Sequence, residues 1–157
     1  MQLIDNEEKT YLCEKFYETA KTALLETGMH NTIFFLVNED QVLMVPNIMR
    51  LDKPEYCGLI SHLAKEMNSR AVICIAEMWG SVLEEGDKRA EDPHFAPSQD
   101  PDAKEGLVVV VSDAFGDATA KMGFFTKKDD TIEFQEEECL DGATLNMIPP
   151  WVERTIH

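Results

Sequence analysis

Two short apolar runs constrain most strongly what this chain can fold into. Residues 71–76 are Ala-Val-Ile-Cys-Ile-Ala and residues 107–111 are Leu-Val-Val-Val-Val, with no charged side chain in either. Short runs of this kind, rich in β-branched residues, predict strands that are buried on both faces of a sheet. Both runs are much shorter than the roughly 20 apolar residues of a membrane-spanning helix. We therefore expect one sheet with these runs as neighbouring inner strands, and no membrane anchor.

The segments around these runs follow helical and extended patterns. Apolar residues recur at helical spacing over residues 6–27, where Asp5 or Asn6 is a candidate N-cap and Gly28 a candidate C-terminal stop. A second helix is expected to start after Asp52, because an apolar stripe follows that residue at the same spacing. β-branched or alternating segments predict further strands at 32–37, 41–45, 118–126 and 131–134.

The order of these elements predicts the fold class. It runs helix, strand, strand, helix, strand, long loop and three more strands, which is an α/β (α+β) arrangement in a single domain, residues 1–142. We expect a mixed sheet of about six strands with its two helices mostly on one side. The other face would then need the apolar C-terminal tail, residues 143–157, or a second subunit. The long loop, residues 81–105, is acidic, and a loop of this length in a compact domain is either functional or mobile.

The charge balance argues against several classes of partner. The chain has 14 Lys and Arg against 30 Asp and Glu, a net charge of −16. Nucleic acids and anionic membranes bind clusters of basic residues, so we expect neither as a partner. Mimicry of a nucleic acid is a further hypothesis, but the acids are spread over every segment, as on a solvated surface. The four dispersed cysteines and the acidic start predict reduced thiols and a cytoplasmic protein without a signal peptide.

Glu77 is the first candidate for chemistry, because it directly follows an apolar run. A carboxyl group drawn into apolar surroundings has a raised pKa, which suits a general acid or base. Alternatively, the strand emerges from the core at Glu77 and the side chain is solvated or hydrogen-bonded. Ser98 and Glu105 are the other candidate catalytic residues.

A polar segment holds the candidate metal ligands, His94, Asp100 and Asp102. Imidazole and carboxylate groups bind zinc, although Asp and Ser residues beside prolines are equally typical of capped turns. The sequence contains no phosphate-binding loop, no H-E-x-x-H zinc motif and no G-x-S-x-G nucleophile motif. We therefore expect no cofactor.

The C-terminal tail is the candidate protein-binding segment. Ile148, Trp151 and Val152 surround a rigid pair of prolines. Tryptophan with apolar neighbours is typical of residues that anchor in a groove on a partner. The alternative is that the tail docks on its own domain, and a dimer formed by exchange of tails lies between the two.

Two short motifs resemble known proteins. E-x-W at Glu77 and Trp79, followed by P-S-x-x-P-x-x-x-E at residues 97–105, resembles a set of small acidic bacterial proteins without an assigned role. Pro97-Ser98-Gln99-Asp100 is loosely similar to the P-S-x-x-D motif of the JAB/MPN isopeptidases, a fold that would imply zinc-dependent hydrolysis. The strand that ends in H-x-H in that family is A-E-M-W here, at residues 76–79, so two zinc ligands are missing. The element order is also similar to that of roadblock-type domains, which form dimers.

These observations lead to one expected function and one alternative. We expect a non-enzymatic cytoplasmic protein that forms a homodimer or binds a protein partner, because one sheet face and an apolar tail lack a predicted cover. The alternative is a metal-dependent, hydrolase-like enzyme that uses Glu77 and residues 92–105.

Overall fold

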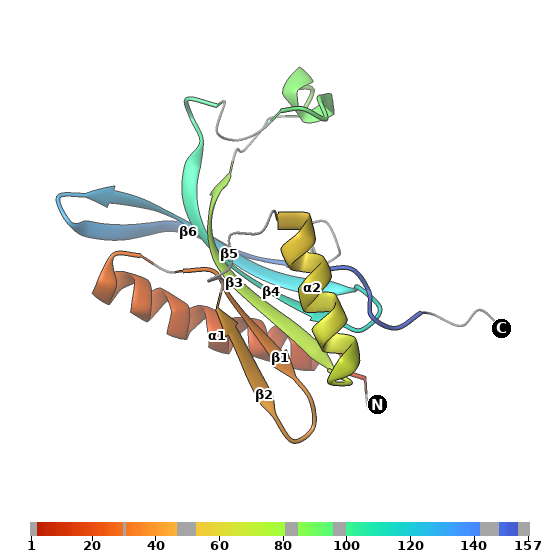
Figure 1. The fold of residues 1–157 in the computed structure, drawn as a ribbon. Helices are drawn as coiled ribbons and strands as arrows, with labels where there is room; N and C mark the ends of the chain where they lie inside the picture. The colour runs from red at the N-terminus through yellow and green to blue at the C-terminus, as the bar shows by residue number, and fades with distance from the viewer. Residues whose placement is uncertain are drawn as a thin grey trace.

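The computed structural model describes residues 3–29, 31–46, 53–80, 85–95, 100–141 and 148–153. The elements follow one another in the predicted order (Figure 1). They are α1 (Asn6–Thr27), β1 (Ile33–Val37), β2 (Val42–Pro46), α2 (Lys53–Glu66), β3 (Ala71–Gly80), the 3-10 helix η1 (Lys88–Glu91), β4 (Lys104–Asp113), β5 (Ala118–Lys128) and β6 (Thr131–Asp141).

The six strands form one sheet in the order β2-β1-β3-β4-β5-β6, and every neighbouring pair is antiparallel. The predicted α+β class and six strands are confirmed, but the expectation of a mixed sheet was wrong. β2 and β3, which α2 connects, do run parallel to each other. They lie on either side of β1 and so do not pair. Each of the two predicted buried runs lies in an inner strand, and β3 pairs with β4.

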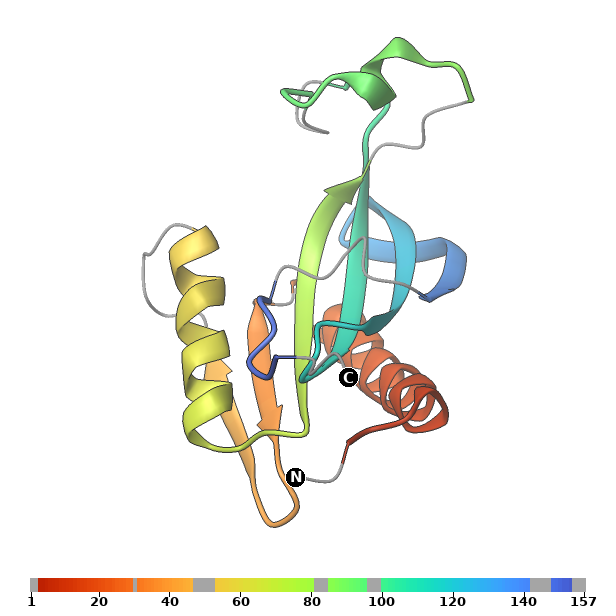
Figure 2. The same cartoon turned by 90° about the vertical axis from the view of Figure 1, so that its right-hand side faces the viewer.

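The two helices cover opposite faces of the sheet, with α1 on one side and α2 on the other (Figure 2). The expectation that both helices lie mostly on one side was therefore wrong. Successive residues of a strand point to opposite faces, and both rows of side chains in β3 and β4 are apolar, so both faces need a cover. Ile73 and Val109 pack with α1, whereas Cys74 and Val110 pack with α2.

Local signals at the ends of α1 are confirmed. The Asp5 carboxylate accepts a hydrogen bond from the Glu8 backbone N–H at 2.8 Å, which satisfies a free donor of the first turn. Gly28 ends the helix with a φ of +81°, a left-handed conformation that favours glycine. Asp52, the expected cap of the second helix, lies outside the described residues.

The described part of the tail docks on the chain itself, beside α2. The side chains of Ile148 and Trp151 are buried in the α2-side core. The Trp151 indole N–H donates to the Ser69 carbonyl at 2.9 Å, and the backbone N–H groups of Trp151 and Val152 both donate to the Ala114 carbonyl at 3.1 Å. The tail therefore helps to cover the second face of the sheet, as one of the two alternatives held.

Two strands are longer than the sequence indicated. β4 begins at Lys104, inside the expected loop, and β6 continues to Asp141 instead of stopping at residue 134. The extension of β6 is rich in glutamate, which has a low strand propensity, but an edge strand exposes these side chains to water. The hairpin of β3 and β4 projects from the body and carries η1 near its tip (Figure 1). We call residues 85–103 of this projection, as far as they are described, the arm.

Candidate interaction surfaces

Three of the singled-out residues meet at the base of the arm. Trp79 of β3 pairs directly with Glu105 of β4, and Glu77 lies two residues earlier on the same strand. Directly opposed side chains of an antiparallel pair lie about 5 Å apart at their Cβ atoms, and alternate residues share a face. Glu77, Trp79 and Glu105 therefore form one cluster on the α1 face, which we call the Trp79 surface.

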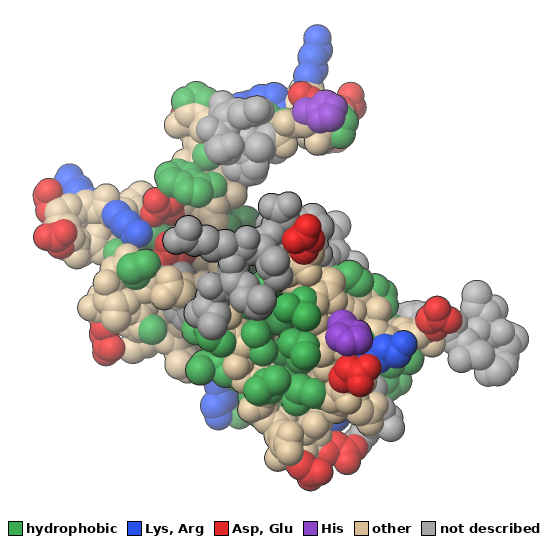
Figure 3. Space-filling model, in the orientation of Figure 1, with side chains coloured by type: hydrophobic (Ala, Val, Ile, Leu, Met, Phe, Trp, Pro, Cys, Tyr) green, Lys and Arg blue, Asp and Glu red, His purple; other side chains and the backbone are tan. Residues whose placement is uncertain are grey.

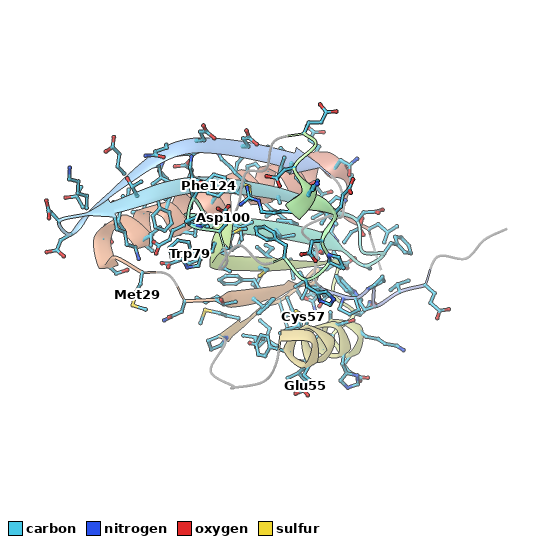
Figure 4. All side chains as sticks on the ribbon, turned by 90° about the horizontal axis from the view of Figure 1, so that it is seen from above. Met29, Glu55, Cys57, Trp79, Asp100 and Phe124 are labelled. Atoms are coloured by element: carbon cyan, nitrogen blue, oxygen red, sulfur yellow. The ribbon has the colours of Figure 1, made fainter. Side chains whose placement is uncertain are left out.

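The Trp79 surface is open to solvent and mostly acidic. The Trp79 side chain is 55% exposed. The Lys127 ammonium is 3.7 Å from the Glu105 carboxylate. In Figure 4, Trp79 and Met29, which follows α1, lie toward the same side of the molecule, away from Glu55 and Cys57 of α2. A large aromatic face with two carboxylates next to it is suited to binding a cationic group.

The candidate metal ligands belong to the arm, where local hydrogen bonds account for their positions. The Asp100 carboxylate is buried, accepts from the Asp102 backbone N–H at 2.9 Å and lies 3.3 Å from the Arg89 guanidinium. His94 is exposed, and its backbone N–H donates a hydrogen bond to the Asp92 carboxylate, which closes the turn. Among the described residues, no three His, Cys, Asp or Glu side chains are grouped so that they could hold a metal ion. Ser98 lies outside that part of the chain.

Arg89 organises the arm from within. Its guanidinium makes a two-point contact with Asp87 and lies over the Phe95 ring at 5.5 Å. Side-chain and backbone hydrogen bonds from Arg89 hold the pKa of the Asp87 carboxyl group below its ordinary value. The arm is thus cross-linked by its own charges. The roles of Glu77 and Glu105 as acid–base catalysts, and of His94, Asp100 and Asp102 as metal ligands, stay predictions.

A groove between α1 and the sheet was not foreseen from the sequence. It has a volume of about 280 Å³, and Ile75 of β3 forms its end nearest to Glu77 along the strand. α1 packs mainly on β4 and β5, which leaves the β1 side of this face less covered. The residues that line the groove are mostly apolar: Lys15, Phe16, Thr19, Ala20, Ala23, Ile33, Phe35 and Ile75.

Among the described elements, the edge strand β2 has the most exposed large apolar side chains. The exposed fractions of Val42, Leu43 and Met44 are 60%, 42% and 56%. Register with β1 places Leu43 on the α2 face and Val42 and Met44 on the α1 face. In Figure 3, hydrophobic side chains gather over the hairpin of β1 and β2 beside α2. β2 is therefore apolar on both faces, and it is an edge strand of the sheet.

The tail residue Val152 lines an open pocket of about 600 Å³ between α2 and the tail. Ser61 closes one side, where its hydroxyl donates to the Pro149 carbonyl at 2.9 Å. His62, Lys65 and Glu153 give the pocket charges of both signs. Ile148 and Trp151 serve the core of their own chain, and the role of Val152 in binding a partner stays a prediction.

None of the four cysteines is in a disulfide bond. Three of them are buried, and Cys139 is exposed. Its thiol donates to the Glu14 carboxylate at 3.0 Å, and the Lys121 ammonium contacts the other oxygen of the same group. Hydrogen bonds from Cys139 and then Lys121 lower the pKa of Glu14. These contacts tie α1 to β5 and β6.

Comparison with known proteins gives one result. No curated protein and no solved structure matches the chain. None of the helices in the described ranges is long and apolar enough to cross a membrane. One family model, described as bacteriophage lambda protein ea47, matches residues 2–153. The chain therefore belongs to the bacteriophage lambda protein ea47 family.

Proposed function

We propose that this chain is a self-associating protein, in which two copies join through their β2 strands. The family description names no activity, so the proposal rests on the chain's own surface. The observation that carries it is an edge strand, Val-Leu-Met-Val-Pro, that has no charged residue and exposes Val42, Leu43 and Met44. Exposed apolar edge strands are templates for pairing with another chain.

A second copy fits this edge by symmetry. Two identical strands that pair antiparallel are related by a two-fold axis, which is the commonest symmetry of soluble dimers. With the axis perpendicular to the sheet, each face of one copy continues into the same face of the other. Val42 and Met44 would then pack against the residues on the α1 face of the partner's β2, and Leu43 and Val45 against those on the α2 face. The result is one continuous sheet with six strands from each copy.

Charge favours β2 over the rest of the surface as the contact. Two copies that each carry a net charge of −16 repel one another. Because β2 itself is uncharged, pairing there brings no carboxylate directly opposite another within the strands. The remaining long-range repulsion is screened by salt, with a Debye length of about 10 Å at 0.1 M. We therefore expect the dimer to become tighter as the salt concentration rises.

Light scattering coupled to size exclusion tests the proposal. The wild-type protein should have twice the 17.8 kDa mass of one chain. Met44→Lys should be monomeric, because the pairing would bring an ammonium group from each copy onto the same apolar face of the contact. Gln135→Lys on exposed β6 is the matched control and should stay dimeric.

Val42→Lys provides a second variant, and circular dichroism checks that each protein is folded. A wild-type mass of one chain, at concentrations up to the millimolar range, would exclude the proposed function. A Met44→Lys protein that is folded and still dimeric would show that the copies join elsewhere.

A further inference from the structure

We propose that the Trp79 surface binds a basic segment of another protein, with an Arg or Lys side chain of that segment stacked on Trp79 beside Glu77 and Glu105. The proposal does not depend on self-association, because the Trp79 surface and β2 are separate. They lie on the same sheet, with β1 between β2 and β3.

The exposure of Trp79 is the first argument. The other tryptophan, Trp151, is 5% exposed and packs in the core, whereas Trp79 is 55% exposed on a regular strand. The buried Trp151 side chain stabilises the core, whereas Trp79 buries much less of its surface and so contributes less to stability. Exposed tryptophan is typical of the few residues that dominate a protein–protein contact.

The flanking charges select the kind of partner. Among side chains, the indole face is the best surface for a cation, and guanidinium groups use it most often. Glu105 lies directly opposite Trp79 on β4, and Glu77 is the neighbour of Trp79 along β3 on the same face, so an arginine over the ring has two carboxylates next to it. A guanidinium can make two parallel hydrogen bonds to one carboxylate, which a lysine cannot. We therefore expect arginine to bind more tightly than lysine.

The groove under α1 extends the same surface. Ile75 lines the groove and lies on the same face of β3 as Glu77 and Trp79. Trp79 is four residue steps along the strand from Ile75, a distance of about 13 Å. A bound segment therefore has room for an apolar side chain in the groove and an arginine over the ring. The net charge of −16 adds attraction for a basic segment at longer range.

Tryptophan fluorescence measures this binding directly. The probe is a synthetic peptide of alternating arginine and leucine residues, and the control peptide has glutamate in place of arginine. The arginine peptide should shift or quench the emission of the wild-type protein. Trp79→Phe leaves only the buried Trp151 as a fluorophore, so its emission should stay unchanged by the peptide. An unchanged wild-type emission would overturn the proposal.

A charge-matched pair of variants separates the local site from the overall charge. Glu77→Gln with Glu105→Gln removes the two flanking carboxylates, and the dissociation constant should rise about tenfold. Glu55→Gln with Glu66→Gln removes two exposed carboxylates from α2 and should change it less than about twofold. Equal weakening in both double variants would mean that only net charge attracts the peptide, which would refute the Trp79 surface as the site. Light scattering of the same proteins measures self-association separately. A lack of peptide binding would therefore not contradict the β2 contact, and a monomeric protein would not contradict the Trp79 surface as a binding site.

Discussion

The two outer strands of the sheet differ in almost every property that controls association. β2 is short, contains no charged residue and exposes three large apolar side chains. β6 is longer and exposes carboxylates along much of its length, including Glu133, Glu136 and Glu138. Charged side chains on an edge strand prevent pairing with other chains. By this rule the side chains of β6 protect that edge of the sheet against pairing, whereas β2 has no such charged side chains.

The two edge strands also differ in their contacts with the rest of the chain. The Lys21 ammonium contacts Glu137, and Glu14 accepts from both Cys139 and Lys121, so α1 is linked to the β6 side by several polar contacts. β2 pairs only with β1 within the described sheet. β6 thus has a carboxylate that contacts α1 and further carboxylates that are exposed to solvent.

Removal of the edge charges should open β6. Glu136→Val with Glu138→Val places two apolar side chains on one face of this strand. We expect assemblies larger than a dimer, because a protein with associating strands at both edges of its sheet forms open chains. Sedimentation velocity measures the size. Thr126→Val with Lys128→Val adds the same side chains to the inner strand β5 and should leave the size unchanged; growth in this control would contradict the role of the edge.

A substitution beside β6 should lower stability without affecting the β2 contact. A Cβ atom at Gly123 would overlap with the hydroxyl group of buried Tyr17. Gly123→Ala should therefore lower the free energy of unfolding by about 1–3 kcal/mol, as overpacking does. Gly58→Ala, where a Cβ meets no atom within 4 Å, is the matched control. Urea unfolding gives both values, and equal stabilities for the two variants would show that α1 does not pack closely on β5.

The sequence predicted the two core strands, the first helix and its caps well, because those features depend on local pattern. Unbroken apolar runs such as residues 107–111 indicate burial on both faces wherever the strand lies. The strand order could not be predicted in the same way, because nothing in the residues near β2 shows that β1 lies between β2 and β3. The arrangement of helices on opposite faces could have been inferred, because two-sided burial needs two covers.

The candidate surfaces depend on register and were harder to foresee. Glu77 and Glu105 stood out in the sequence as candidate catalytic residues, and Trp79 only as part of a resemblance to small bacterial proteins. That resemblance stays untested, and the family shown is a phage family. Their meeting on one face requires the exact pairing of β3 with β4. The apolar edge of β2 was visible in the sequence as a strand, but its place at the border of the sheet was not.

The Glu14 contact should have the smallest effect, and its sign depends on pH. The pKa of Glu14 is below its ordinary value of 4.5, so the ionised group stabilises the fold. This contribution is present above that ordinary value and is lost as the pH falls through the lowered pKa. The side chain is 45% exposed, so Glu14→Gln should cost under about 1 kcal/mol at pH 7.

Urea unfolding at several pH values checks this prediction. The difference between wild type and Glu14→Gln should narrow as the pH is lowered below 4.5. Glu26→Gln, an exposed position on the same helix, should show no such trend. A difference that widens in acid would mean that Glu14 is destabilising in its ionised form.

Hydrogen exchange of the β2 amides tests the proposed contact most directly, because it reports whether a second copy covers this strand. Mass spectrometry of peptides that cover Val42–Pro46 and Thr131–Asp141 should show protection of β2 that rises with protein concentration, while exchange in β6 stays constant. Exchange of β2 that is independent of concentration, in a protein that light scattering shows to be dimeric, would contradict the proposed contact.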